Sequence, residues 1–272
     1  MQVTLISGLL AVALYLLGCV FQGLNFSNTK PNNKISKRTV FVVGILAALA
    51  HGISAYGVIK AANGYHFGIS QISTLITVSI SLLVIISSLR KPLENLFLGL
   101  FPLAIISILA SLTISSQFPP TQMSLSLASH VIISILAYSF FTIAALQAGF
   151  LAYQNHHLKH AKLGGMISKL PPLQDMESFL FELLWVGQLL LSLGIVVGAV
   201  FIDDIWGRDG IIHKSFFSVL AWCVFAVLLW GRHQLGWRGV TAIKGTLAGF
   251  GLLLIGFYGS KFALEYLLAQ PL

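Results

Sequence analysis

Three histidines, His51, His130 and His213, lie inside or at the edge of long apolar segments of the sequence. An ionisable side chain at bilayer depth is costly unless it is paired, so each of them is a candidate for a function. Imidazole is a good axial ligand for haem iron, and facing helices can present two histidines to one macrocycle. The pattern indicates a haem b site with His51 and His130, or His130 and His213, as iron ligands. The alternative is that each imidazole bonds a serine, a tyrosine or a backbone carbonyl in a packed core, and His213 also fits a helix cap or a lipid-interface residue.

Other chemistry has weaker support in the sequence. His156 and His160 have the i, i+4 spacing of a metal site, but they lie among lysines without a neighbouring carboxylate or cysteine, which indicates a partly protonated face at the membrane surface. The sequence has no CxxCH motif for covalent haem attachment, and no P-loop, HExxH or GxSxG motif. We therefore expect that the protein is not an enzyme.

The apolar segments that carry the histidines are typical of transmembrane helices. Hydrophobic residues make up 57% of the 272 residues and charged residues only 9%, whereas a soluble domain has about a quarter of its residues charged. About 20 helical residues cross a hydrocarbon core of roughly 30 Å. We predict an all-α, polytopic membrane bundle of about eight transmembrane helices in a single domain over 1–272, with spans near residues 3–24, 39–60, 68–89, 95–114, 125–153, 177–202, 214–231 and 241–268.

The distribution of basic residues predicts the orientation of these spans. Twelve of the sixteen Lys and Arg residues fall in the connections after spans one, three, five and seven, and basic loops stay in the cytoplasm. Both termini are therefore expected in the periplasm of a bacterial inner membrane, and the three candidate histidines in the outer half of the bundle. The net charge of +8 suits contact with anionic lipid and does not indicate nucleic acid.

One connection has the residues that end and begin helices. Pro171 and Pro172 should break the chain before span six, and Asp175 and Glu177 should lie at or near the first turn of that span, where the helix dipole favours anions.

Several stretches resemble a known family. The segment GAVFIDDIWG at 198–207, followed by AWCVFA at 221–226 and GWRG at 236–239, is similar to the tryptophan-rich outer loop and following helix of the cytochrome c assembly family, whose members handle haem in the CcsA and CcmC systems. The segments LASHVIISILAYSFFTIAAL at 127–146 and LPPLQDMESFLF at 170–181 look like the small YpjD branch of that family.

The resemblance implies roles for particular residues. In the family the tryptophan-rich loop cradles haem at the outer surface and flanking histidines ligate the iron, so Trp206 should stack on the porphyrin and His130 matches the first flanking histidine. Arg208, Lys214 and Lys261 could pair with the haem propionates. Arg208 also stands where the family has another tryptophan, and no histidine stands at the second flanking position near Tyr266.

Two functions follow as hypotheses. The first is an inner-membrane haem-binding and haem-handling protein that presents haem at the outer face of the membrane. The second is a non-catalytic membrane interaction or regulatory protein that kept the fold, lost haem handling and binds another membrane protein. A Soret band in the purified protein would separate them.

Overall fold

The structure is a computed structural model that describes residues 2–27, 35–89, 94–116, 119–160, 170–201 and 211–262; the side chains of residues 94, 201 and 211–214 are not described. Eight helices of the described residues are long and apolar enough to cross a membrane. This confirms the predicted all-α membrane fold and its eight spans. The helices group into two compact units, residues 1–121 with 157–171 and residues 122–156 with 172–272, called unit 1 and unit 2 below. The single domain over 1–272 stays a prediction.

Unit 1 is a bundle of four helices in which α1 packs on α2 and α4, and α3 packs on the same two helices. Their bounds are α1 Gln2–Ser27, α2 Lys37–Ile59, α3 Ile69–Ser88 and α4 Glu94–Thr113. The rings of Tyr15 and Phe101 are buried at its centre, 5.2 Å apart. A Cβ atom on Gly18 would lie 2.6 Å from the ring of Phe101, so the absence of a side chain lets α1 and α4 approach closely.

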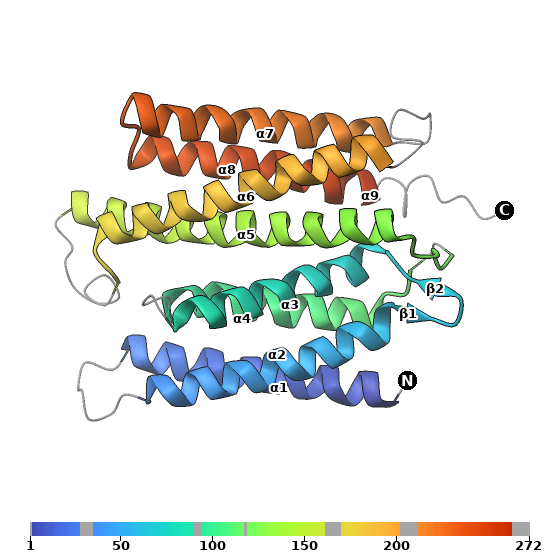
Figure 1. Cartoon of the computed structure of the whole chain (residues 1–272). Helices are drawn as coiled ribbons and strands as arrows, with labels where there is room; N and C mark the ends of the chain where they lie inside the picture. Colours follow the sequence, from blue (N-terminus) through green and yellow to red (C-terminus); the bar gives the residue numbers. More distant parts are fainter. Residues whose placement is uncertain are drawn as a thin grey trace. The chain divides into compact units, whose positions relative to one another are not determined.

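A short hairpin joins α2 to α3 in unit 1 (Figure 1). Strands β1 (Lys60–Ala61) and β2 (Gly64–Tyr65) are antiparallel, with Lys60 opposite Tyr65. The backbone N–H of Tyr65 also donates to the carbonyl oxygen of Thr121 over 3.0 Å, and the N–H of Thr121 donates back over 2.9 Å. The hairpin thereby ties the α2–α3 connection to the chain that follows α4.

Unit 2 contains the C-terminal helices. Their bounds are α5 Leu125–Lys159, α6 Leu173–Phe201, α7 Ile211–Gln234 and α8 Val240–Leu254, followed by the π-helical turn η3 Ile255–Gly259 and the short α9 Ser260–Phe262. The rings of Phe141 in α5 and Phe225 in α7 stack with centroids 4.0 Å apart, and the hydroxyl of Tyr138 donates to the carbonyl oxygen of Leu253 over 3.0 Å. Helix α5 therefore contacts both α7 and α8.

Two helix bounds in the described part of the chain differ from the sequence prediction by four residues or more. Helix α5 continues to Lys159 instead of ending near 153, so His156 lies on the helix while His160 stands in the turn after it. Helix α6 begins at Leu173, directly after the predicted proline break, and the carbonyl oxygen of Pro172 accepts the N–H groups of Asp175 and Met176. The break is confirmed, four residues before the predicted span.

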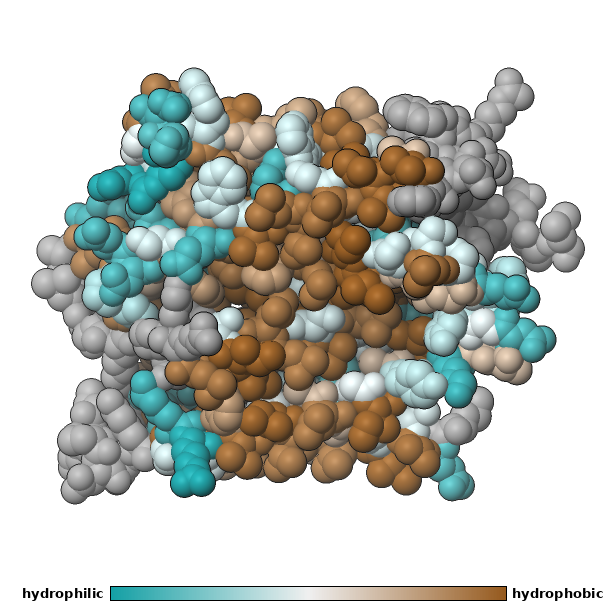
Figure 2. Space-filling model, in the orientation of Figure 1, coloured by the Kyte–Doolittle hydropathy of each residue, from teal (hydrophilic) through white to brown (hydrophobic). Residues whose placement is uncertain are grey.

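The surface of the helices has the hydropathy expected for lipid contact. Figure 2 shows hydrophobic residues over the middle of the helices and hydrophilic residues near their ends. Helix α1 exposes Val3, Ile6 and Val20 at 55% or more of their surface. Such exposure suits a helix whose surroundings are lipid.

Candidate functional site

His130 is the candidate ligand of unit 2. It lies in the second turn of α5, half-buried, and its Nδ1 is 3.0 Å from the carbonyl oxygen of Gly194 in α6. A carbonyl oxygen only accepts, so in this bond Nδ1 carries the proton and donates it. The neutral imidazole then has its lone pair on Nε2, and the bond also fixes the orientation of the ring. Metal-ligating histidines in proteins commonly hold one ring nitrogen in this way, and a backbone carbonyl partner equally matches the packed-core alternative of the sequence analysis.

The surroundings of His130 come from α5 and α6. A Cβ atom on Gly194 would lie 3.6 Å from Ser134 Oγ and 3.7 Å from Ile133 Cγ2, both in α5, so the two helices are in van der Waals contact beside the histidine. Gly194 is seven residues before the end of α6 at Phe201, which is about 10 Å of helix rise. The last residue of α6 thus lies about two turns from the level of His130.

His51 has a different environment. Its side chain is fully buried in unit 1, with Nδ1 3.3 Å from the hydroxyl of Tyr15 and Nε2 2.8 Å from Thr74 Oγ1. Both ring nitrogens therefore have hydroxyl partners, from α1 and from α3. Iron ligation by His51 would require one of these hydrogen bonds to break, and the geometry corresponds to the packed-core alternative of the sequence analysis.

The remaining predicted site residues have no described side-chain geometry. Trp206 and Arg208 lie outside the described residues, and His213 and Lys214 lie in the first turn of α7 with side chains that are not described. His51 and His130 belong to different units, so their pairing on one iron stays a prediction.

A charged cluster in unit 2 was not predicted. Arg232 Nη1, in the last turn of α7, donates to Glu177 Oε1 over 2.8 Å, and the backbone N–H of Gly239 donates to Glu177 Oε2 over 3.1 Å. The guanidinium also lies over the ring of Phe181, with Cζ 4.7 Å from the centroid. Only 10% of the Glu177 side chain and 25% of the Arg232 side chain are exposed. The carboxylate thus joins the start of α6 to both sides of the α7–α8 connection.

The α7–α8 connection depends on glycine at two positions. The ring of Trp237 lies where a Cβ atom on Gly231 would be, and Gly239 has a φ of +54°. The first position lets the indole pack on the end of α7, and the second puts the backbone in a left-handed region that favours glycine. Gly239 belongs to the GWRG segment at 236–239 that carries the family resemblance, which was the available signal that this corner is important.

Comparison with known proteins finds a matching protein family and several similar proteins. The family model described as cytochrome C assembly protein matches residues 39–268. The inner membrane protein YpjD of Escherichia coli (strain K12) is 26% identical over 228 residues, which cover 83% of this chain and 86% of that protein. The cytochrome c biogenesis protein CcsA of Prochlorococcus marinus (strain MIT 9215) is 26% identical over 201 residues, or 65% and 63% of the two chains.

A third relative is an uncharacterized 28.8 kDa protein in the nifR3-like 5' region of Azospirillum brasilense, 25% identical over 239 residues that cover 85% of this chain and 88% of that one. No solved structure matches the chain. The eight apolar helices and the similarity to an inner membrane protein identify a multi-pass protein of the bacterial inner membrane, with the lipid bilayer as its solvent.

Proposed function

The chain is a member of the cytochrome c assembly protein family, and from this premise we propose that it binds haem b and presents it at the outer face of the inner membrane. The proposed role is haem binding and handling, without catalysis of a reaction by the protein itself. The relatives named for cytochrome c biogenesis support a connection with cytochrome c maturation.

The observation that carries the proposal is the hydrogen bond of His130. Because the Gly194 carbonyl holds the proton on Nδ1, the imidazole has the tautomer and the fixed orientation that an axial ligand to iron requires. The ligating atom would be Nε2. The sequence likeness of 127–146 to the family points to the same residue.

The other proposed contacts to haem come from residues that follow α6 in the sequence. Trp206, in the connection after α6, would stack on the porphyrin face, and the cationic side chains of Arg208 and Lys214 would pair with the propionates. His213 is the proposed second axial ligand, because it lies in the first turn of the helix that follows this connection. His51 is better explained as a structural residue of unit 1, since hydroxyl groups engage both of its ring nitrogens.

The test is an absorption spectrum of the detergent-purified full chain, as isolated and after dithionite. The wild type should show a Soret band with sharpened bands on reduction. His130→Ala should lose the pigment, His51→Ala should keep it, and His130→Met should keep a pigment with a shifted spectrum, because methionine is an alternative axial ligand.

The matched control is His233→Ala, which removes an exposed histidine at the opposite end of α7 from His213. Its spectrum should equal that of the wild type. Size-exclusion profiles of all variants separate loss of haem from loss of fold. A colourless wild type that also fails to take up added haem would refute the proposal and favour a membrane interaction or regulatory protein with another membrane protein as its partner.

A further inference from the structure

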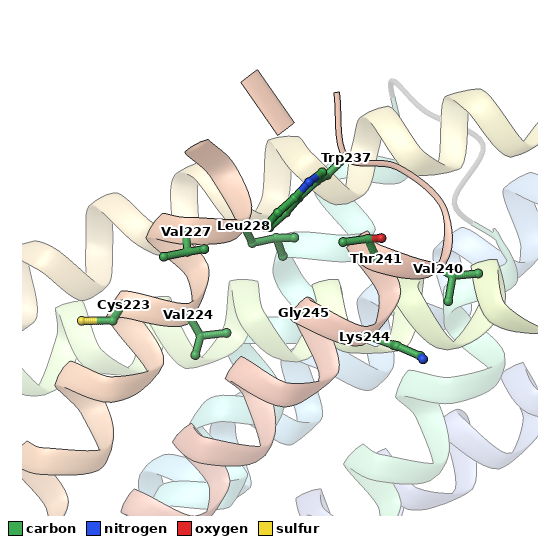
Figure 3. Close-up of a pocket in the computed structure, with 9 residues that line it drawn as sticks. All are labelled: Cys223, Val224, Val227, Leu228, Trp237, Val240, Thr241, Lys244 and Gly245. Carbon is green, nitrogen blue, oxygen red and sulfur yellow. The ribbon is translucent and has the colours of Figure 1, made fainter. Parts of the chain in front are cut away.

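A groove runs along the surface of unit 2 between α7 and α8 (Figure 3). Its volume is about 490 Å³, within the roughly 300–1,000 Å³ of small-molecule sites. Helices α7 and α8 contribute equally to its wall, Trp237 covers the end next to the α7–α8 connection, and Lys244 stands on the α8 rim with its ammonium group directed away from α7. The groove is lined by residues that include Cys223, Val224, Val227, Leu228, Trp237 and Lys244.

The groove covers most of the depth of one membrane leaflet. Cys223, at its far end, is eight residues before Gly231, against which the ring of Trp237 packs, and this corresponds to about 12 Å of helix rise. Half of a hydrocarbon core of roughly 30 Å is about 15 Å. The groove therefore reaches from the membrane surface at Trp237 most of the way to the middle of the bilayer, as an acyl chain does.

The mouth of the groove is positively charged. Lys244 is exposed, and within the described residues it forms no hydrogen bond or ion pair. Arg238, next to Trp237 in the chain, has 69% of its side chain exposed. The carboxylate of Glu177, which lies 3.9 Å from the Arg238 Nε, already accepts hydrogen bonds from Arg232 and Gly239.

We propose that this groove binds one phospholipid with a net negative headgroup, taken from the leaflet that contacts the α7–α8 connection. The acyl chain lies along Val224, Val227 and Leu228, and Lys244 binds the headgroup phosphate at the depth where indole rings such as Trp237 reside. The charge selects the occupant, because a basic pocket between transmembrane helices suits an anionic headgroup. A zwitterionic headgroup brings its own cation beside the phosphate, and an apolar partner helix would leave Lys244 without a counter-charge.

The experiment measures quenching of tryptophan fluorescence by lipids brominated near the headgroup end of the acyl chain. The full chain is reconstituted in phosphatidylcholine vesicles that contain either brominated phosphatidylglycerol or brominated phosphatidylcholine at equal fractions. The difference between the wild type and Trp237→Phe isolates the signal of Trp237. We expect phosphatidylglycerol to bind at this position about fivefold more tightly than phosphatidylcholine for each basic residue engaged.

Four variants test the assignment. Lys244→Gln should reduce the preference about fivefold, Lys244→Arg should retain it, and Val227→Trp should fill the groove and reduce quenching by both lipids. Lys60→Gln, an exposed lysine of unit 1, should change nothing. Equal quenching by the two lipids in the wild type, or a preference that survives Lys244→Gln in a correctly folded variant, would overturn the proposal. The absence of quenching by either lipid, together with a dimer that Val227→Trp dissociates, would also overturn the proposal, because a second copy of the chain would then fill the groove.

Discussion

Removal of the Glu177 carboxylate should destabilise unit 2 more than removal of any surface charge. Glu177 accepts a hydrogen bond from Arg232 Nη1 at 2.8 Å and another from the backbone N–H of Gly239 at 3.1 Å. In Glu177→Ala the guanidinium of Arg232 loses its counter-charge while three-quarters of its side chain stays buried, because only 25% is exposed. The α7–α8 connection also loses its attachment to α6.

The expected loss in the free energy of unfolding lies between two limits. Exposed ion pairs contribute about 0–1 kcal/mol, and breaking a fully buried pair costs about 3–5 kcal/mol. The Glu177 side chain is 10% exposed, so Glu177→Ala is closer to the buried limit, at about 2–3 kcal/mol. For a chain of this size that corresponds to a decrease of about 5–10 °C in the midpoint of thermal unfolding.

The assay is thermal unfolding in detergent, followed by tryptophan fluorescence. A double-mutant cycle with Glu177→Gln, Arg232→Gln and the double variant should give a coupling energy of about 1–2 kcal/mol. Arg238→Gln is the matched control: its Nε is 3.9 Å from Glu177 Oε1 and 69% of its side chain is exposed, so the change should stay below about 0.5 kcal/mol. A midpoint shift of less than 1 °C for Glu177→Ala, or a coupling energy near zero, would refute this reasoning.

Two further predictions concern packing inside the units. Thr74→Val leaves Nε2 of the fully buried His51 without its 2.8 Å partner; the loss should cost about 1 kcal/mol, a value typical of hydrogen bonds between transmembrane helices, and should leave any haem spectrum unchanged. Gly249→Val should cost more than about 2 kcal/mol, because a Cβ atom there would lie 2.6 Å from the ring of Phe225. Gly251→Ala, where a Cβ atom meets nothing within 4 Å, should be neutral or stabilising in the same unfolding assay, and an equal loss in both glycine variants would contradict the packing argument.

The transmembrane helices were predictable because the bilayer imposes a length. An apolar run of about 20 residues has few alternatives to a membrane-crossing helix. The bounds were less predictable where a helix leaves the hydrocarbon. Helix α5 continues through the polar segment from Gln154 to Lys159 without a break. The helix there continues through the backbone hydrogen bonds of successive turns, and hydropathy does not show where these bonds end.

The charged cluster could not be predicted from spacing. Glu177 and Arg232 are 55 residues apart, and neither has a partner at helical spacing on its own element. The sequence correctly predicted Glu177 near the start of span six. That prediction used only the interaction of the carboxylate with the dipole of its own helix, so it gave no information about Arg232. The contact arises only when the ends of α6 and α7 pack together.

His51 and His130 show why residue type and an apolar setting do not identify a haem ligand. A neutral imidazole has one N–H donor and one lone pair, and the partners of the two nitrogens decide its use. Two hydroxyl groups, which both donate and accept, engage both nitrogens of His51 and suit either tautomer. A backbone carbonyl accepts only, so it fixes the tautomer of His130 and directs the lone pair to Nε2. Helix packing thus sets the tautomer of His130, because Gly194 in α6 supplies that carbonyl from a position 64 residues away in the chain.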